Sequence, residues 1–136
     1  MPHFVLEYTS NIKAEADIPG LLKKVTKVLL SQNGLFRPGG TRARAYEAHD
    51  YSIADGEEDY AFVHCQLKMG AGRAEADKKK AFDELFEMIK EHFAELYSRR
   101  YLAISMEVGE FSEAGTYKHN NLHARFRKTT EGLKNG

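Results

Sequence analysis

The chain has 136 residues, a length that fits one compact domain, and its 20 basic and 20 acidic residues balance. This balance argues against a general binder of nucleic acids or acidic membranes, since both need a basic surface. Cys65 is the one cysteine, so an internal disulfide is excluded. No stretch approaches the ~20 apolar residues of a membrane span, and the N-terminus lacks a signal-peptide pattern. We therefore expect a cytoplasmic protein without membrane or nucleic-acid partners.

The first half begins with a predicted strand at residues 2–9, where aromatic and branched side chains alternate with others. Asp17 is a plausible helix N-cap, and Pro19 falls in the first turn, where its missing N–H costs little. Apolar residues at helical spacing over 18–29 predict the helix itself. Asn33-Gly34 is the signal that ends it.

The second half repeats this order. A turn at 37–40 and a returning strand at about 41–51 complete the first half, and alternation predicts a further strand at 61–67. Gly70-Ala71-Gly72 is expected to open a long helix, followed by a last strand at 101–108. The apolar stripe of the long helix consists of Phe82, Leu85, Phe86, Ile89, Phe93 and Leu96.

These elements predict an α+β fold of two β-α-β units, at about 2–55 and 60–110. Right-handed crossovers would then give one four-stranded sheet with both helices on one face. The domain would span 1–127, and the charged, glycine-rich stretch 128–136 would be a flexible tail. The second face would be apolar in part and uncovered, which favours oligomerisation.

The second residue carries the most distinctive chemistry. If Met1 is removed, Pro2 becomes a secondary amine at the chain start, whereas proline nitrogen elsewhere in a chain is a non-basic amide. An apolar site would lower the pKa of this amine by disfavouring its charged form, which suits a base that works near neutrality. The alternative is a proline that only begins a strand, where proline is tolerated.

Three arginines are candidates for binding an anion. Arg42 and Arg44 are two apart on a predicted strand and therefore share a face. Arg73 follows the glycine-rich segment at an expected helix start, where an anion is favoured and a carboxylate can be bound bidentately. For each of them a solvated surface charge is the competing interpretation.

The remaining histidines, the cysteine and the lysine run do not indicate a functional site. His119 and His123 are four apart, but their segment is not predicted to be helical, so no metal site is expected. Cys65 and His64 point to opposite faces of a strand and cannot act together, and Cys65 is assigned to the core. The run 77–80, with three lysines, is expected to be a solvated helix face.

Several separated blocks resemble one enzyme family in order and spacing. They are Met-Pro-His-Phe at the start, Gly-Thr-Arg-Ala-Arg at 40–44, Asp-Tyr-Ala-Phe-Val-His at 59–64, Leu-Lys-Met-Gly-Ala-Gly-Arg at 67–73 and Asn-Asn-Leu-His-Ala at 120–124. Over residues 2–126 the chain resembles the 5-carboxymethyl-2-hydroxymuconate isomerases of the tautomerase superfamily. Relatives in the superfamily include 4-oxalocrotonate tautomerase and macrophage migration inhibitory factor.

The resemblance implies a homotrimer and a cofactor-independent proton transfer in the bacterial breakdown of homoprotocatechuate. Pro2 matches the catalytic base, and Arg42 and Arg73 match the arginines that hold substrate carboxylates. Arg44, on the same strand face, is a weaker substrate-binding assignment. Two alternatives remain open: another tautomerase activity, such as one on phenylpyruvate, and a non-catalytic ferredoxin-like binding module.

Overall fold

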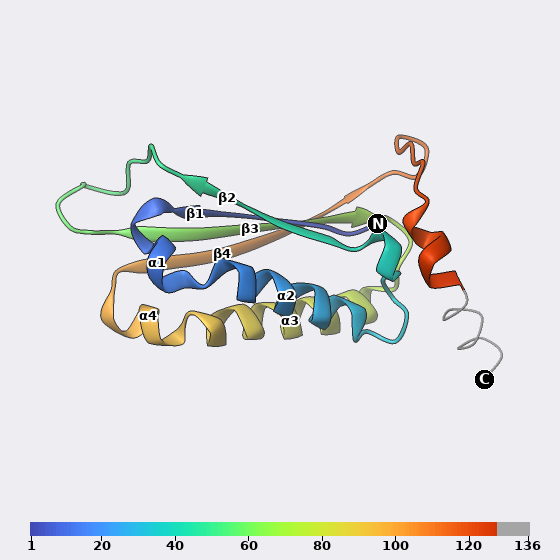
Figure 1. The fold of residues 1–136 in the computed structure, drawn as a ribbon, viewed down its shortest axis with the longest axis horizontal. Helices are drawn as coiled ribbons and strands as arrows, with labels where there is room; N and C mark the ends of the chain where they lie inside the picture. The colour runs from blue at the N-terminus through green and yellow to red at the C-terminus, as the bar shows by residue number, and fades with distance from the viewer. Residues whose placement is uncertain (128–136) are drawn as a thin grey trace.

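The computed structural model describes residues 1–127, so the predicted tail at 128–136 lies outside the described residues. One four-stranded sheet carries its helices on a single face (Figure 1). The strands are β1 (His3–Thr9), β2 (Arg42–Ala48), β3 (Ala61–Gly70) and β4 (Leu102–Phe111). The helices are α1 (Lys13–Ala16), α2 (Ile18–Leu30), α3 (Glu75–His92) and α4 (Ala94–Arg99), with 3-10 turns η1 (Ser10–Ile12) and η2 (Pro38–Gly40).

The strand order β2-β1-β3-β4 confirms the predicted duplication. Each half pairs its two strands in parallel, β1 with β2 and β3 with β4, and the halves join through the antiparallel pair β1 and β3. Parallel neighbours require a long crossover, which α2 and α3 supply. Both long helices therefore lie against the same face of the sheet, as Figure 1 shows.

The predicted start of α2 is confirmed in detail. The Asp17 side chain accepts a hydrogen bond from the N–H of Gly20 at 3.2 Å, and Pro19 lies in the first helical turn. This cap satisfies a backbone donor that the helix itself leaves unpaired. The apolar stripe of the helix then meets the buried side chains of β1: Leu21, Val25 and Leu29 pack with Phe4, Leu6 and Tyr8 in one core.

Two predicted boundaries in the second half are wrong. β3 continues to Gly70, and α3 begins only at Glu75 with Ala74 as its N-cap, so Arg73 precedes the helix instead of opening it. The β3–β4 ladder continues as far as Gly70, paired with Phe111, which keeps this glycine in the strand. A helical segment at 122–127 was not predicted either. None of the helices in residues 1–127 is long and apolar enough to cross a membrane.

The lysine run on α3 is only partly the solvated face that was expected. Lys78 is buried, and its ammonium group contacts Glu75 at 2.6 Å and Glu110 of β4 at 2.8 Å. These carboxylates raise the pKa of Lys78 through hydrogen bonds, Glu110 first. Lys79 and Lys80 are exposed, as predicted. Lys78 therefore joins α3 to the edge strand of the sheet.

The uncovered face of the sheet is apolar in part, as expected, and also carries many polar side chains. Register places His3, Arg42 and Lys68 side by side across β1, β2 and β3 at one end of this face. Further along, His64 Nδ1 contacts the Ser105 hydroxyl at 2.7 Å, and Gln66 donates a hydrogen bond to Glu107 at 2.6 Å. The apolar side chains of this face include Val5, Tyr46, Phe62 and Ala103.

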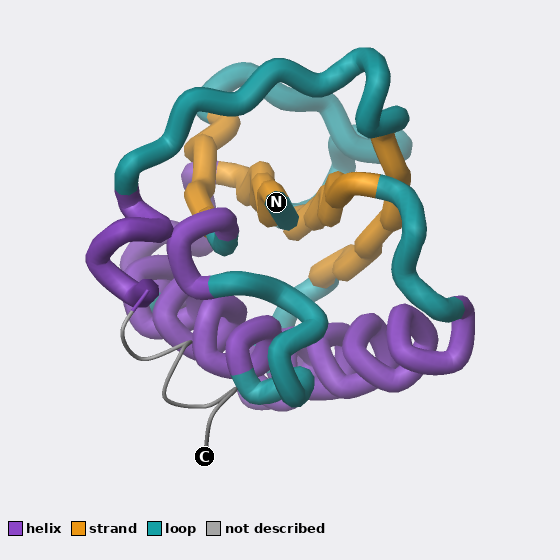
Figure 2. Tube along the Cα trace, turned by 90° about the vertical axis from the view of Figure 1, so that its right-hand side faces the viewer, coloured by secondary structure: helices purple, strands orange, loops and turns teal. Residues whose placement is uncertain are grey.

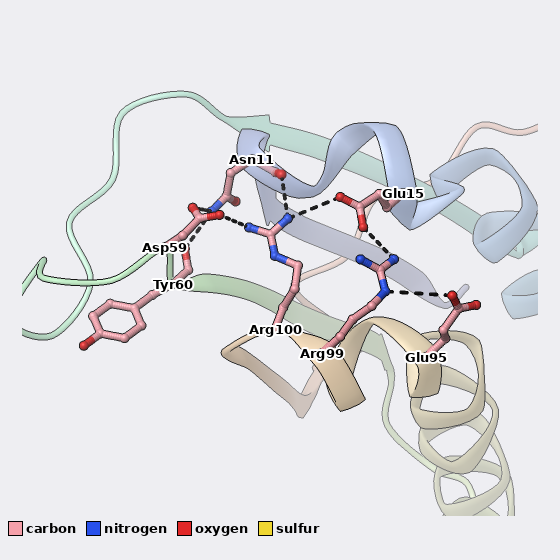
Figure 3. Close-up of polar contacts among 7 residues, drawn as sticks. All are labelled: Asn11, Glu15, Asp59, Tyr60, Glu95, Arg99 and Arg100. Atoms are coloured by element: carbon pink, nitrogen blue, oxygen red, sulfur yellow. Dashed lines mark hydrogen bonds and ion pairs between the residues drawn. The ribbon is translucent and has the colours of Figure 1, made fainter.

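A charged cluster ties the two halves together at the end of the sheet where β1 finishes (Figure 3). Arg100, which follows α4, donates to the backbone oxygen of Asn11 at 3.0 Å and forms ion pairs with Glu15 and Asp59. Asn11 in turn donates to Asp59 at 3.0 Å. The Arg100 side chain is largely buried, whereas its partner Asp59 is mostly exposed to solvent.

Candidate active site at the N-terminus

The chain start lies at the opposite end of the sheet, beside the start of β2. Pro2 is buried, and its carbonyl oxygen accepts a hydrogen bond from the backbone N–H of Arg42 at 3.1 Å. The next residue, His3, pairs with Arg42 in the parallel ladder. Pro2 and His3 are therefore held in place by the sheet, which is unusual so close to a chain terminus.

A cavity of about 250 Å³ opens at this terminus. Its wall combines the first residue with three segments that are distant in sequence: the loop before β2, the loop after β3 and the stretch after β4. Figure 2 views the molecule from this end, with the N-terminus near the centre of the curved sheet. The lining residues are Met1, Gly34, Leu35, Arg37, Gly40, Arg73, Glu113, Lys118 and His123.

Arg73 is fixed against the wall of this cavity by three contacts. Its Nε donates to the backbone oxygen of Leu35 at 3.0 Å, and one Nη donates to Gly70 at 2.9 Å. The guanidinium also lies 4.8 Å from the centre of the buried Phe36 ring, a cation–π contact. The loop at 32–38 thus positions Arg73, a role that sequence analysis did not predict.

The field of this cavity acts on the terminal amine. Burial lowers the pKa of the Met1 amino group below its ordinary value, and the positive charges of Arg73, Lys118 and Arg42 lower it further. Glu113 opposes them. Desolvation and like charges both disfavour the protonated amine, so the site favours a neutral amine that can accept a proton.

Arg42 and Arg44 share a strand face, as predicted, but their surroundings differ. Arg42 is not a lining residue, but it directs one Nη toward the backbone oxygen of the lining residue Gly40 at 3.5 Å, and its charge acts on the terminal amine. Arg44 contacts Nδ1 of His3 at 3.2 Å on the uncovered face of the sheet, and it does not line the cavity. The structure thus brings Arg42 and Arg73 near the terminal amine, whereas Arg44 lies two residues further along β2.

Sequence analysis missed the contribution of the stretch after β4. A Cβ at position 39 would lie 2.7 Å from Nδ1 of His123, and one at position 40 would lie 2.9 Å from Cγ of Met1. Gly39 and Gly40 therefore allow Met1 and His123 to approach the start of β2. The sequence pointed to this stretch only through the block at 120–124. The spacing of that block did not predict a contact with residues 39–40.

Two further features considered in the sequence are Cys65 and a metal site. Cys65 is buried in the core, as predicted, and burial raises the pKa of its thiol to about 12. Within residues 1–127, no group of three or more His, Cys, Asp or Glu side chains is arranged to hold a metal ion.

A larger hollow of about 720 Å³ lies at the other end of the sheet, lined in part by Tyr60, Tyr97 and Tyr101. It is shallow, and the nearby Arg100 is already engaged by the charged cluster. The smaller cavity combines an amine with several cations, so it is the better candidate for chemistry.

Comparison with known proteins shows the family of this chain. The family model described as 5-carboxymethyl-2-hydroxymuconate isomerase matches residues 2–126. This chain belongs to that isomerase family. A relative from Escherichia coli, 5-carboxymethyl-2-hydroxymuconate Delta-isomerase, is 45% identical over 127 residues, which cover 93% of this chain and 100% of the relative. The predicted family and the prediction of an isomerase are both confirmed.

Solved structures place the fold in the same family. The crystal structure of a 5-carboxymethyl-2-hydroxymuconate isomerase from Deinococcus radiodurans has a TM-score of 0.88 at 50% identity, and the match covers 93% of this chain and 94% of that one. A fused 4-OT symmetric trimer matches with a TM-score of 0.62 at 16% identity, over 86% of this chain and 93% of that one. The latter likeness concerns the fold alone.

Proposed function

We propose that this isomerase acts with the free amine of Pro2, after removal of Met1, as its proton-transferring base. The observation that supports this role most is the position of the chain start at a cavity lined by Met1, Arg73 and Lys118. In the full chain the amine belongs to Met1 and the Pro2 nitrogen is an amide. Removal of Met1 moves the free amine to the buried Pro2.

The proposed reaction converts 5-carboxymethyl-2-hydroxymuconate, a dienol, into its 2-oxo-3-ene isomer. The neutral amine of Pro2 takes the proton of the 2-hydroxyl, and the resulting dienolate is stabilised by its own conjugation. The protonated amine then delivers the proton to carbon 5. Protons and electrons balance within one substrate molecule, and the base is regenerated.

Arg42 and Arg73 would orient the carboxylates of the substrate. Arg73 is already held by Leu35 and Gly70, so its position costs little further ordering when substrate binds. Developing negative charge on the dienolate would be offset by these cations. Arg44 shares a strand face with Arg42 but lies two residues further along β2, in contact with His3. It would contribute only if a neighbouring subunit or a side-chain rearrangement brings it to the site.

We further propose that the protein is a cytoplasmic homotrimer in the degradation of homoprotocatechuate. Its small-molecule substrate needs neither a nucleic acid nor a membrane partner. The uncovered sheet face and the two edge strands, β2 and β4, are available for contacts between subunits. The match of the family model over residues 2–126 favours this reading over a ferredoxin-like binding module.

The test compares two forms of the protein, each confirmed by mass. One begins at Pro2, and the other carries one extra residue before it. Isomerisation of 5-carboxymethyl-2-hydroxymuconate should be fast in the first and nearly abolished in the second, because an amide nitrogen accepts no proton. Circular dichroism should show that both are folded. Equal turnover by the two forms would refute Pro2 as the base.

A further inference from the structure

Lys118 is a cation of the cavity that the mechanism above leaves without a role. It lines the cavity with Met1 and Arg73, and its charge acts on the terminal amine together with that of Arg73. Its ammonium group is 3.8 Å from a carboxylate oxygen of Glu113, and the side chain is 37% exposed. A weak, partly exposed ion pair of this kind contributes little to folding stability.

The chain around Lys118 is anchored on both sides. On one side, a tight turn follows β4, in which Gly115 N–H donates to the backbone oxygen of Ser112 at 3.2 Å and the Thr116 hydroxyl donates to the same oxygen at 2.7 Å. On the other side, the Asn120 side chain donates to the backbone oxygen of Gly39 at 2.9 Å. These hydrogen bonds fix the segment on both sides of Lys118, and so they hold Lys118 at the cavity.

Charge matching suggests what Lys118 binds. The proposed substrate carries three carboxylates, and the mechanism assigns two cations, Arg42 and Arg73, to carboxylates. One carboxylate is left, and the lining of the cavity holds two further cations, Arg37 and Lys118. Of these two, Lys118 is the one whose charge acts on the terminal amine, so we match the remaining carboxylate to Lys118. An ammonium group binds a carboxylate as a point charge through any of its three donors.

We propose that Lys118 is a specificity-determining residue that binds the carboxymethyl carboxylate of the substrate and so selects a tricarboxylate over a dicarboxylate. This inference rests on the proposed function for its substrate. Without substrate, Glu113 holds Lys118 near the cavity. The incoming carboxylate replaces that weak pair, and Lys118 exchanges one carboxylate partner for another.

The test is the variant Lys118→Met, which keeps most of the side-chain volume and removes the charge. Its steady-state kinetics are compared with those of the parent on 5-carboxymethyl-2-hydroxymuconate and on 2-hydroxymuconate, which lacks the carboxymethyl group. Assays are run at a pH where the rate no longer rises with pH. KM for the tricarboxylate should increase about tenfold, the scale of one charge-assisted contact. KM for the dicarboxylate should stay within about twofold, and kcat for both should change little.

Two further variants make this result specific. Lys118→Arg retains the positive charge and should recover most of the selectivity. Lys79→Met removes an exposed lysine on α3 that pairs with Asp83 and should behave like the parent on both substrates. An equal KM increase on the two substrates, or no increase on either, would overturn the proposal for Lys118.

A binding measurement separates this inference from the proposed function. Calorimetric titration of the form that begins at Pro2 uses two unreactive probes, propane-1,2,3-tricarboxylate and glutarate. Lys118→Met should weaken binding of the first about tenfold and leave the second nearly unchanged. If Lys118→Met weakens binding of both probes equally, or of neither, the proposed role of Lys118 is wrong even if the enzyme is active. Conversely, a parent that discriminates between the probes through Lys118 but isomerises no dienol refutes the proposed function alone.

Discussion

The carbonyl oxygen of Pro2 accepts a hydrogen bond from the backbone N–H of Arg42 across 3.1 Å. This contact joins the first residue of the proposed mature chain to the first residue of β2. It fixes the proposed base relative to one of the cations proposed to bind its substrate, through backbone groups alone. Side-chain substitutions at either position should therefore change the chemistry of the site more than its shape.

The rate of isomerisation should rise with pH through the titration of the Pro2 amine, because only its neutral form accepts a proton. Burial, Arg73 and Lys118 lower the pKa of the terminal amine, and Glu113 raises it. For the amine of Pro2 in the same cavity, Arg73→Ala should shift the midpoint of kcat/KM to higher pH and Glu113→Gln to lower pH. The measurement is the pH profile of kcat/KM, which reports groups of the free enzyme. Unchanged midpoints in both variants would contradict this electrostatic account.

Arg42→Ala and Arg73→Ala should each lower kcat/KM by ~10²-fold or more, the scale of one charged transition-state contact. Arg73→Ala also removes donors to Leu35 and Gly70, so it should loosen the 32–38 loop as well. Arg73→Lys retains the charge but lacks the planar guanidinium that can donate two parallel hydrogen bonds, so it should recover only part of the activity. Arg99→Ala, at the far end of the sheet, is a matched control expected to be fully active. Near-normal activity of Arg42→Ala or Arg73→Ala would remove that arginine from the site.

A homotrimer should be the species in solution at micromolar concentration. The sheet leaves one face without helices and exposes two edge strands, β2 and β4, and a single chain offers no further element within residues 1–127 to cover them. Light scattering coupled to size-exclusion chromatography measures the mass directly. A stable monomer would count against the assembly, and a dimer would change which surfaces are buried.

Arg100→Ala should lower the free energy of unfolding by about 2 kcal/mol, since it leaves charged and backbone groups of the cluster in Figure 3 without their partner. Arg99→Ala is the control, because Arg99 is half exposed and its loss should cost less than ~1 kcal/mol. Urea titration of both variants gives the two values. Isomerase activity should be unchanged in each, as the cluster lies at the other end of the sheet from the cavity. Equal stabilities of the two variants would show that the burial of Arg100 has no energetic consequence.

Cys65 should be inert to thiol reagents in the native state. Its side chain is buried, and burial raises the pKa of the thiol to about 12, so the reactive thiolate is almost absent at neutral pH. An aromatic disulfide reagent should label the protein only after denaturant is added. Rapid labelling of the native protein would show that the core around β3 opens readily.

Local patterns were enough to predict the fold. Alternation in β1, the Asp17 cap, the apolar stripe of α2 and the likeness of the two halves are properties of neighbouring residues, and they depend on short-range geometry. The boundary of α3 was wrong because glycines at 70–72 carry a helix-start signal that pairing with β4 overrides: Gly70 is still in the ladder, paired with Phe111. Lys78 was predicted to be exposed because its partner Glu110 lies on a strand 32 residues away.

The amino-acid sequence by itself determined the candidate base, since only the second position can offer a proline amine, and it marked Arg42 and Arg73 through the family blocks. Only the tertiary structure decided that the 32–38 loop holds Arg73, that Arg44 contacts His3, and that Lys118 lines the cavity. The physical reason is contact between distant segments. Gly39 and Gly40 leave space that His123 and Met1 fill, and no spacing along the chain encodes which residues meet there.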